Sequence, residues 1–96
     1  MYVLITYDVN TSGVGGQKRL RHVAKCCQNY GQRVQNSVFE CLVTESQLIT
    51  LRHSLSTVID KNADSIRIYK LGKNYMTKIE HIGVETSFNI EGELII

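Results

Sequence analysis

The sequence predicts one small α+β domain, and three observations lead to this prediction. The chain has 96 residues, which is too few for two independent hydrophobic cores. Strand-like segments alternate along the chain with two segments whose apolar residues recur at helical spacing. Hydrophobic residues make up 43% of the sequence, an ordinary fraction for a globular domain that excludes general disorder. We therefore expect residues 1–96 to form a single domain.

The first half of the chain predicts a strand, a helix and a second strand. Residues 2–9 are apolar on both alternating faces, which is typical of a central strand. A loop rich in turn-forming residues follows, and we expect a helix over about 16–30, with Gly31 as its end. One apolar stripe on this helix comprises Leu20, Val23, Ala24, Cys27 and Tyr30. Residues 33–43 alternate as a long second strand.

The second half predicts another helix and further strands. Thr44 and Gln47 have the spacing of a capping box, so they open a helix that Asn62 can close. The apolar face of this helix comprises Leu48, Leu51, Leu55, Val58 and Ile59. Three later segments have strand character: residues 65–71, the weaker segment 77–82, and the short terminal segment 93–96.

The order of these elements is β-α-β-β-α-β under either of two conditions. The long stretch 33–43 must bend or bulge, or the third and fourth strands must pair. The nearest common architecture is the ferredoxin-like split βαβ, in which two helices cover one face of an antiparallel sheet, here with a short additional C-terminal strand. Because the first strand is apolar on both faces, we expect the open face to contact a second copy of the chain.

Positive charge is concentrated in one segment of a nearly neutral chain, whose net charge is +2. Residues 9–39 contain five basic side chains and no acidic one. These basic residues are Lys18, Arg19, Arg21, Lys25 and Arg33. Such a distribution favours a polyanionic partner, so we expect these five side chains to contact nucleic-acid phosphates. The alternative is a charged helix face that contacts only solvent.

Asp8 is the most suggestive candidate for chemistry. It ends an apolar strand immediately before a glycine-rich loop. A carboxylate there suits Mg²⁺, which proteins often hold with one or two carboxylates plus water and substrate phosphate. The alternative is that Asp8 caps the turn through backbone N–H groups. A two-fold axis would favour the metal site, because it would bring two copies of Asp8 together.

Other features exclude several classes of protein. No apolar run approaches the roughly 18 residues that a membrane span needs, so we expect no membrane association. The three cysteines are an odd number without a disulfide framework, which predicts a reducing cytoplasmic location. No Ser-His-Asp or Cys-His arrangement for nucleophilic catalysis is readable.

Three segments of the chain together resemble one family of small proteins. They are residues 4–9 (Leu-Ile-Thr-Tyr-Asp-Val), residues 18–20 (Lys-Arg-Leu) and residues 31–40 (Gly-Gln-Arg-Val-Gln-Asn-Ser-Val-Phe-Glu). Residues 64–69 and the strand-forming C-terminus also fit. On these segments the chain resembles the CRISPR-associated Cas2 family over nearly its whole length. The chain length and the closeness of the match imply the subtype I-C form.

The resemblance implies a ferredoxin-like fold and a homodimer joined through the open sheet faces. In the family the C-terminal strand extends the sheet of the other protomer, and Leu94 to Ile96 would do so here. The resemblance also implies a site for Mg²⁺, or Mn²⁺, between the protomers, with Asp8 of each chain as the metal ligand. The positions that match residues implicated in catalysis are Tyr7, Asp8, Arg33 and Phe39, with Arg19 as a further match.

Members of the family are described as metal-dependent endonucleases that cleave double-stranded DNA or RNA. They also act with the CRISPR integrase in the acquisition of new spacers, a step of prokaryotic antiviral immunity. The resemblance therefore implies this activity and this partner. The alternative is a non-catalytic dimeric bridge that presents basic helices to duplex DNA while the integrase does the chemistry. The basic segment and the scarcity of catalytic groups support that alternative.

Overall fold

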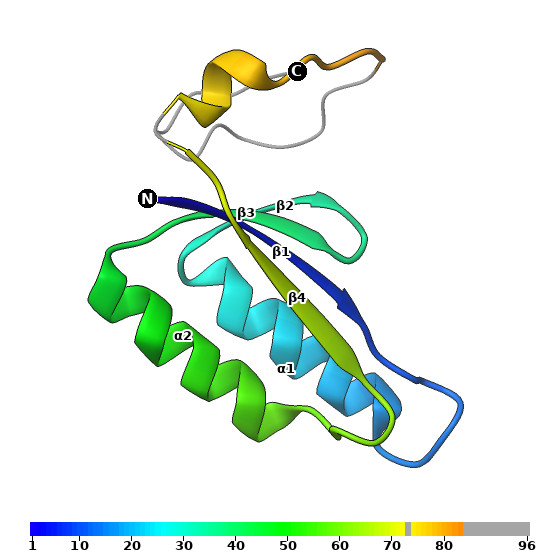
Figure 1. Cartoon of the computed structure of the whole chain (residues 1–96). Coiled ribbons are helices and arrows are strands. Elements are labelled where there is room, and N and C mark those ends of the chain that lie inside the picture. The colour runs from blue at the N-terminus through cyan, green and yellow to red at the C-terminus, as the bar shows by residue number, and fades with distance from the viewer. Residues whose placement is uncertain (73, 84–96) are drawn as a thin grey trace.

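A computed structural model describes residues 1–72 and 74–83 of the chain, and its strands form one four-stranded sheet (Figure 1). In chain order the elements are β1 (Tyr2–Asp8), α1 (Gly16–Gln28), β2 (Gly31–Gln35), β3 (Val38–Leu42), α2 (Glu45–Val58), β4 (Ser65–Lys70) and the 3₁₀ helix η1 (Tyr75–Lys78). The strand order is β2-β3-β1-β4, every neighbouring pair is antiparallel, and both helices cover one face. The predicted α+β class and the ferredoxin-like βαββαβ order are confirmed.

The predicted long strand 33–43 is a hairpin. β2 and β3 are separated by a turn at Asn36 and Ser37, and the register between them shifts between Arg33 and Gln35. The segment therefore bends, which is the first of the two conditions that give the β-α-β-β-α-β order. The bend places β3 beside β1, so β1 is a central strand, as its apolar residues on both faces predict.

The capping box of α2 is confirmed. The Gln47 backbone N–H donates to the Thr44 hydroxyl at 3.1 Å, and the Thr44 N–H donates to the Gln47 side-chain carbonyl at 2.9 Å. The helix ends earlier than expected, because Ile59 already has extended backbone angles of −87° and 160°. Asn62 therefore lies beyond the helix, in a turn where its N–H donates to the Asp60 carboxylate at 2.9 Å.

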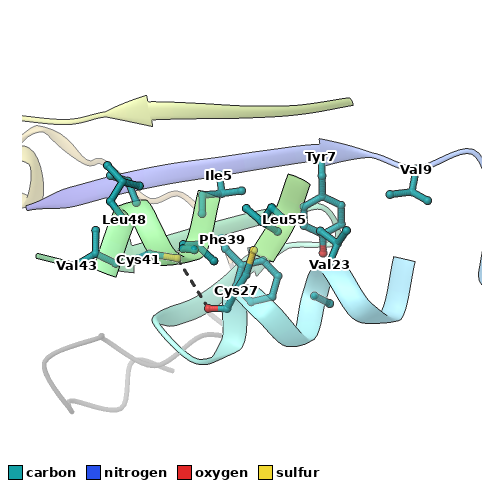
Figure 2. Close-up of a cluster of buried hydrophobic side chains, with 13 residues drawn as sticks. Ile5, Tyr7, Val9, Val23, Cys27, Phe39, Cys41, Val43, Leu48 and Leu55 are labelled. Carbon is teal, nitrogen blue, oxygen red and sulfur yellow. Dashed lines mark hydrogen bonds between the residues drawn. The ribbon is translucent and has the colours of Figure 1, made fainter. Parts of the chain in front are cut away.

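The hydrophobic core lies between the sheet and the two helices (Figure 2). Alternate residues of a strand share a face, so the buried residues Val3, Ile5 and Tyr7 of β1 all belong to it. The buried residues are Val3, Ile5, Tyr7, Val9, Val23, Ala24, Cys27, Phe39, Cys41, Val43, Leu48, Leu51 and Leu55. The helix-stripe residues packed partly buried against them are Leu20, Tyr30, Val58 and Ile59. The predicted apolar residues all pack on the core, although Tyr30 and Ile59 lie just beyond the ends of α1 and α2.

The predicted strand over 77–82 is wrong. Residues 75–78 form the helix η1, and no regular structure follows up to Gly83. The physical reason lies in a local turn: the Thr77 N–H and hydroxyl both donate to the Asn74 carbonyl, at 3.1 and 2.7 Å. This turn commits the Thr77 N–H, a group that a strand would need for pairing. The predicted terminal strand 93–96 lies outside the described residues.

Candidate metal and nucleic-acid sites

Tyr7 and Asp8 are neighbours in the sequence but lie on opposite faces of the sheet. The Tyr7 side chain points toward α1 and is only 5% exposed (Figure 2). Its ring stacks on that of Phe39, with 6.2 Å between centroids, and its hydroxyl donates to the Asn36 carbonyl at 3.3 Å. Burial is the main cause that raises the pKa of the Tyr7 hydroxyl, so it stays neutral near pH 7. Tyr7 is therefore a core residue.

Asp8 is an exposed carboxylate at the last position of β1, where it pairs in register with Ser65 of β4. Within residues 1–72 and 74–83 its side chain makes no hydrogen bond or ion pair. The turn that follows is capped by Asn10, whose side-chain oxygen accepts from the Ser12 N–H at 3.0 Å and hydroxyl at 2.6 Å. Turn capping thus does not occupy Asp8, and the described part of the chain leaves its carboxylate open to a ligand.

The chemistry of Asp8 fits a divalent-metal site only if a second chain completes it. A carboxylate is the hard oxygen donor that Mg²⁺ and Mn²⁺ prefer. The part of the chain that the structure describes holds no group of three or more His, Cys, Asp or Glu side chains able to surround a metal ion. At the end of β1 the described residues of one protomer offer the carboxylate of Asp8, whereas two copies related by a two-fold axis would offer two such carboxylates.

The open face of the sheet carries a row of apolar side chains on the same side as Asp8. The strand register places Tyr2 opposite Leu42 and Leu4 opposite Tyr69. Leu42 and Tyr69 are each 41% exposed in the single chain. The same face also carries Glu40, which is the other register partner of Leu4, and Arg67, the partner of Thr6. Exposed apolar side chains between charged ones are suited to a protein contact. The face that carries Asp8 is thus suited to cover by another molecule.

Arg33 belongs to the other side of the sheet. It pairs in register with Phe39, and its guanidinium lies 5.4 Å from the centre of the Phe39 ring. Phe39 itself is fully buried. Arg33 also lowers the pKa of Tyr7, although less than burial raises it. The fold therefore brings together three predicted catalytic residues, Tyr7, Arg33 and Phe39, and separates them from Asp8.

Four of the five predicted phosphate contacts are exposed. They are Lys18, Arg21, Lys25 and Arg33. The last three, with Leu20 and Ala24, line a shallow hollow of about 450 Å³ between α1 and β2. Basic side chains around such a hollow can contact successive phosphates of a nucleic acid without recognising its bases. The basic surface, defined by these four residues, is a candidate nucleic-acid interface.

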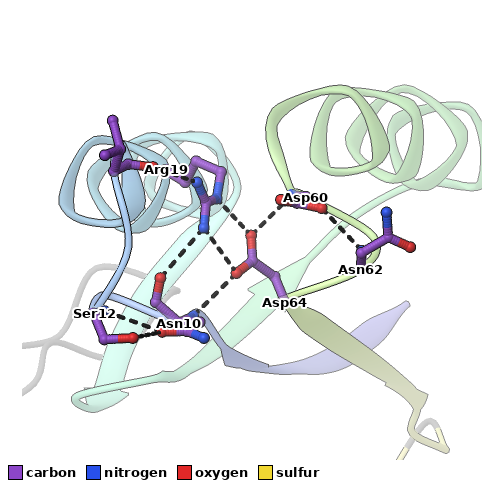
Figure 3. Close-up of polar contacts among 7 residues, drawn as sticks. Asn10, Ser12, Arg19, Asp60, Asn62 and Asp64 are labelled. Atoms are coloured by element: carbon purple, nitrogen blue, oxygen red, sulfur yellow. Dashed lines mark hydrogen bonds and ion pairs between the residues drawn. The ribbon is translucent and has the colours of Figure 1, made fainter.

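Arg19, the fifth predicted phosphate contact, is bound within the protein (Figure 3). Its Nε donates to Asp64 Oδ2 at 2.8 Å, and the side chain of Asp64 is completely buried. The hydrogen bond from Arg19 is the main cause that lowers the pKa of Asp64 to about 2. Sequence reasoning assigned no role to Asp64. The only local signal was its place just before a strand, and its partner lies 45 positions away in the chain.

No helix in residues 1–72 and 74–83 combines the length and the apolar character that crossing a membrane requires. All three cysteines, Cys26, Cys27 and Cys41, are free thiols. Burial raises the pKa of Cys27 to about 12 and that of Cys41 to about 11. These two thiols therefore stay protonated and pack as small apolar groups.

Comparisons with known proteins agree on one family. The family model described as CRISPR associated protein Cas2 matches residues 1–79. Over 95 residues the chain is 63% identical to the CRISPR-associated endonuclease Cas2 of Halalkalibacterium halodurans, with 99% of each chain covered. Over 96 residues it is 51% identical to the CRISPR-associated endoribonuclease Cas2 of Nitratidesulfovibrio vulgaris, covering 100% of this chain and 94% of the relative.

A solved structure agrees with these matches. The crystal structure of Streptococcus pyogenes Cas2 at pH 6.5 superposes with a TM-score of 0.79 at 58% sequence identity. The match covers 86% of this chain and 100% of that one. Sequence and fold thus lead to the same conclusion: the chain belongs to the CRISPR-associated Cas2 family.

Proposed function

We propose that this chain is a metal-dependent endonuclease that hydrolyses phosphodiester bonds of double-stranded DNA or RNA during CRISPR spacer acquisition. The observation that carries the proposal is the exposed carboxylate of Asp8 at the end of the central strand, which no group in residues 1–72 or 74–83 binds. The names of the relatives, an endonuclease and an endoribonuclease, support nuclease activity. The finer assignment to subtype I-C rests on the chain length and on the closeness of the resemblance, and the CRISPR integrase is the expected partner.

The active form in this proposal is a homodimer joined through the open sheet faces. Leu42 and Tyr69 supply apolar surface that a second copy would bury, and a chain of this size gains stability from such burial. Two copies of Asp8 then lie on the shared face. The protein acts in the cytoplasm, where its free thiols stay reduced.

Asp8 from each protomer would hold Mg²⁺ or Mn²⁺. When bound, the ion polarises the scissile phosphate and lowers the pKa of its water. The basic surface holds the nucleic-acid backbone through Lys18, Arg21 and Lys25, and Arg33 joins it from β2. Tyr7 and Phe39 are positioning residues in this mechanism, because their buried rings support Arg33 from the core side.

The alternative function is a non-catalytic dimeric bridge for the integrase. A specific observation favours it: of the four predicted catalytic residues, only Asp8 lies on the open face, whereas the basic side chains remain exposed. A bridge needs the basic surface and the dimer but not the carboxylate. The two functions therefore differ in what they require of Asp8.

The deciding experiment replaces Asp8 by Asn in the full chain. This change keeps the side-chain shape and removes the charge that a hard cation needs. We expect metal-dependent cleavage to be lost, while duplex binding, measured on the same purified dimer, persists. Glu45→Gln, which removes an exposed charge at the start of α2, is the matched control. Undiminished metal-dependent cleavage by Asp8→Asn would contradict the proposal, and wild-type spacer acquisition by a cleavage-dead variant would assign the cellular role to the bridge.

A further inference from the structure

The buried carboxylate of Asp64 joins three segments of the chain (Figure 3). Its Oδ1 accepts from the Asn10 backbone N–H at 3.0 Å, and its Oδ2 accepts from the Asp60 N–H at 2.9 Å. Arg19 completes the set through Nε at 2.8 Å and a longer contact from a terminal nitrogen at 3.4 Å. Within residues 1–72 and 74–83, Asp64 is the one charged residue that is buried. Both carboxylate oxygens are thus committed.

The Arg19 side chain is committed in the same way. One terminal nitrogen donates to the Asn10 carbonyl at 3.2 Å, and the other reaches the Val14 carbonyl at 3.4 Å. Every nitrogen of the guanidinium therefore has a partner inside the protein, and the side chain is only 20% exposed. We call this set, Arg19 and Asp64 with the backbone groups of Asn10, Val14 and Asp60, the Arg19–Asp64 clamp.

The clamp lies where β1 and β4 meet at the position of Asp8. Asn10 follows Asp8 by two residues, and Asp64 directly precedes Ser65, the register partner of Asp8. One carboxylate therefore ties the chain leaving β1 to the chain entering β4. The direction of the Asp8 side chain depends on this backbone, because the described residues offer its carboxylate no partner of their own.

The start of α1 reinforces the clamp. A side chain at Gly16 would place its Cβ 2.3 Å from the Asn10 carbonyl oxygen and 2.7 Å from the Cα of Thr11. Only glycine allows this approach of the helix to the loop. The helix that carries Arg19 is therefore packed directly against the segment that follows Asp8.

We propose that Arg19 and Asp64 are positioning residues that hold the Asp8 carboxylate where two protomers can share a metal ion. This inference rests on the proposed function. Its physical basis is that a metal site of two carboxylates depends on their placement, and small displacements of a ligand weaken binding strongly. Arg19 thus contributes through Asp64 and the backbone, and it does not contact phosphate.

The test measures binding of Mn²⁺ alone to the folded full-length dimer, without nucleic acid. Arg19→Lys keeps the positive charge but loses the forked donors, and Asp64→Asn keeps the shape but loses the charge. We expect each to weaken Mn²⁺ binding by about 10- to 100-fold. The double variant should bind Mn²⁺ as well as the single variant with the lower affinity does, because both changes open the same clamp. Arg52→Lys, on the exposed surface of α2, is the matched control with unchanged affinity.

The outcomes separate this inference from the proposed function. If Asp8→Asn binds Mn²⁺ like the wild type, both are wrong. If Asp8→Asn loses Mn²⁺ while Arg19→Lys and Asp64→Asn bind it normally, only the clamp inference is wrong. A lower melting temperature with unchanged Mn²⁺ affinity of the folded dimer would also overturn it, since that is a purely structural effect. Should Asp64→Asn fail to fold, Arg19→Lys decides the question alone.

Discussion

The two faces of the sheet differ in how their side chains are held. On the helix face, Ile5, Tyr7 and Phe39 are almost fully buried and packed on one another. On the open face, Leu42 is 41% exposed and the carboxylate of Asp8 is exposed as well. Tyr7 and Asp8 separate because successive strand residues point to opposite faces. A pair of neighbouring residues that looks like one motif is thus a core residue followed by a candidate ligand.

The largest expected effect is on the helix face. Phe39→Ala removes a fully buried ring, so we expect the free energy of unfolding to fall by about 3–5 kcal/mol. The total free energy of unfolding of a small domain is only about 5–15 kcal/mol, so we expect a larger fraction of the molecules to be unfolded at 37 °C. Urea denaturation followed by circular dichroism measures the change. A loss below about 1 kcal/mol would mean that the ring is not a central part of the core.

A substitution on the open face should weaken the proposed dimer. Leu42→Asp puts a charge into the proposed contact, and we expect the dimer to dissociate about 30-fold more readily, which corresponds to about 2 kcal/mol. Sedimentation velocity over a concentration series measures this. Ile49→Asp is the control, because Ile49 is 63% exposed on α2, away from the sheet. Equal effects of the two substitutions would contradict the assignment of the open face as the contact.

The Arg19–Asp64 clamp, which lies where β1 and β4 meet, should make the free energy of unfolding depend on pH. The native pKa of Asp64 is about 2, below the roughly 3.9 of an unfolded Asp. The unfolded chain therefore binds more protons in this window, and the contribution of Asp64 to stability is complete above about pH 5 and is lost as the pH falls toward 2. Urea midpoints between pH 5 and pH 2 should fall more steeply for the wild type than for Asp64→Asn. Parallel curves would contradict this prediction.

The smallest effect is expected at Tyr7. Tyr7→Phe removes one hydroxyl that donates to the Asn36 carbonyl at 3.3 Å, and we expect a loss of about 0.5–1.5 kcal/mol in unfolding free energy. Cleavage should stay near the wild-type rate, since the hydroxyl lies in the core. A cleavage defect as large as that of Asp8→Asn would show that the hydroxyl acts in the reaction, and it would break the division between the two faces.

Local sequence patterns predict the elements that form through interactions between residues close together in the chain. The capping box of Thr44 and Gln47, the apolar stripes of both helices and the central strand all follow from spacing and alternation. The predicted strand over 77–82 is wrong, because a short alternation does not reveal a turn held by the Asn74 carbonyl. Strand periodicity also implies that Tyr7 and Asp8 diverge, yet the resemblance grouped them.

The candidate site was less predictable, because distant residues decide it. Arg19 and Arg21 look alike in the sequence, since both are basic residues on α1. Only the fold brings Asp64 against Arg19, which commits that side chain and leaves Arg21 exposed. No local pattern encodes a pairing across 45 positions. Whether Asp8 meets its copy depends on a second chain, which lies beyond any single-chain pattern.

The most direct test of the central claim counts metal ions per chain. If the open face is the shared face and Asp8 its ligand, titration of the purified dimer with Mn²⁺, followed by electron paramagnetic resonance, should reach saturation at one ion per two chains. Asp8→Asn should bind none at this site, whereas Tyr7→Phe should keep the wild-type stoichiometry. Saturation at one ion per chain, or an unchanged stoichiometry in Asp8→Asn, would contradict the claim that two protomers share one site through Asp8.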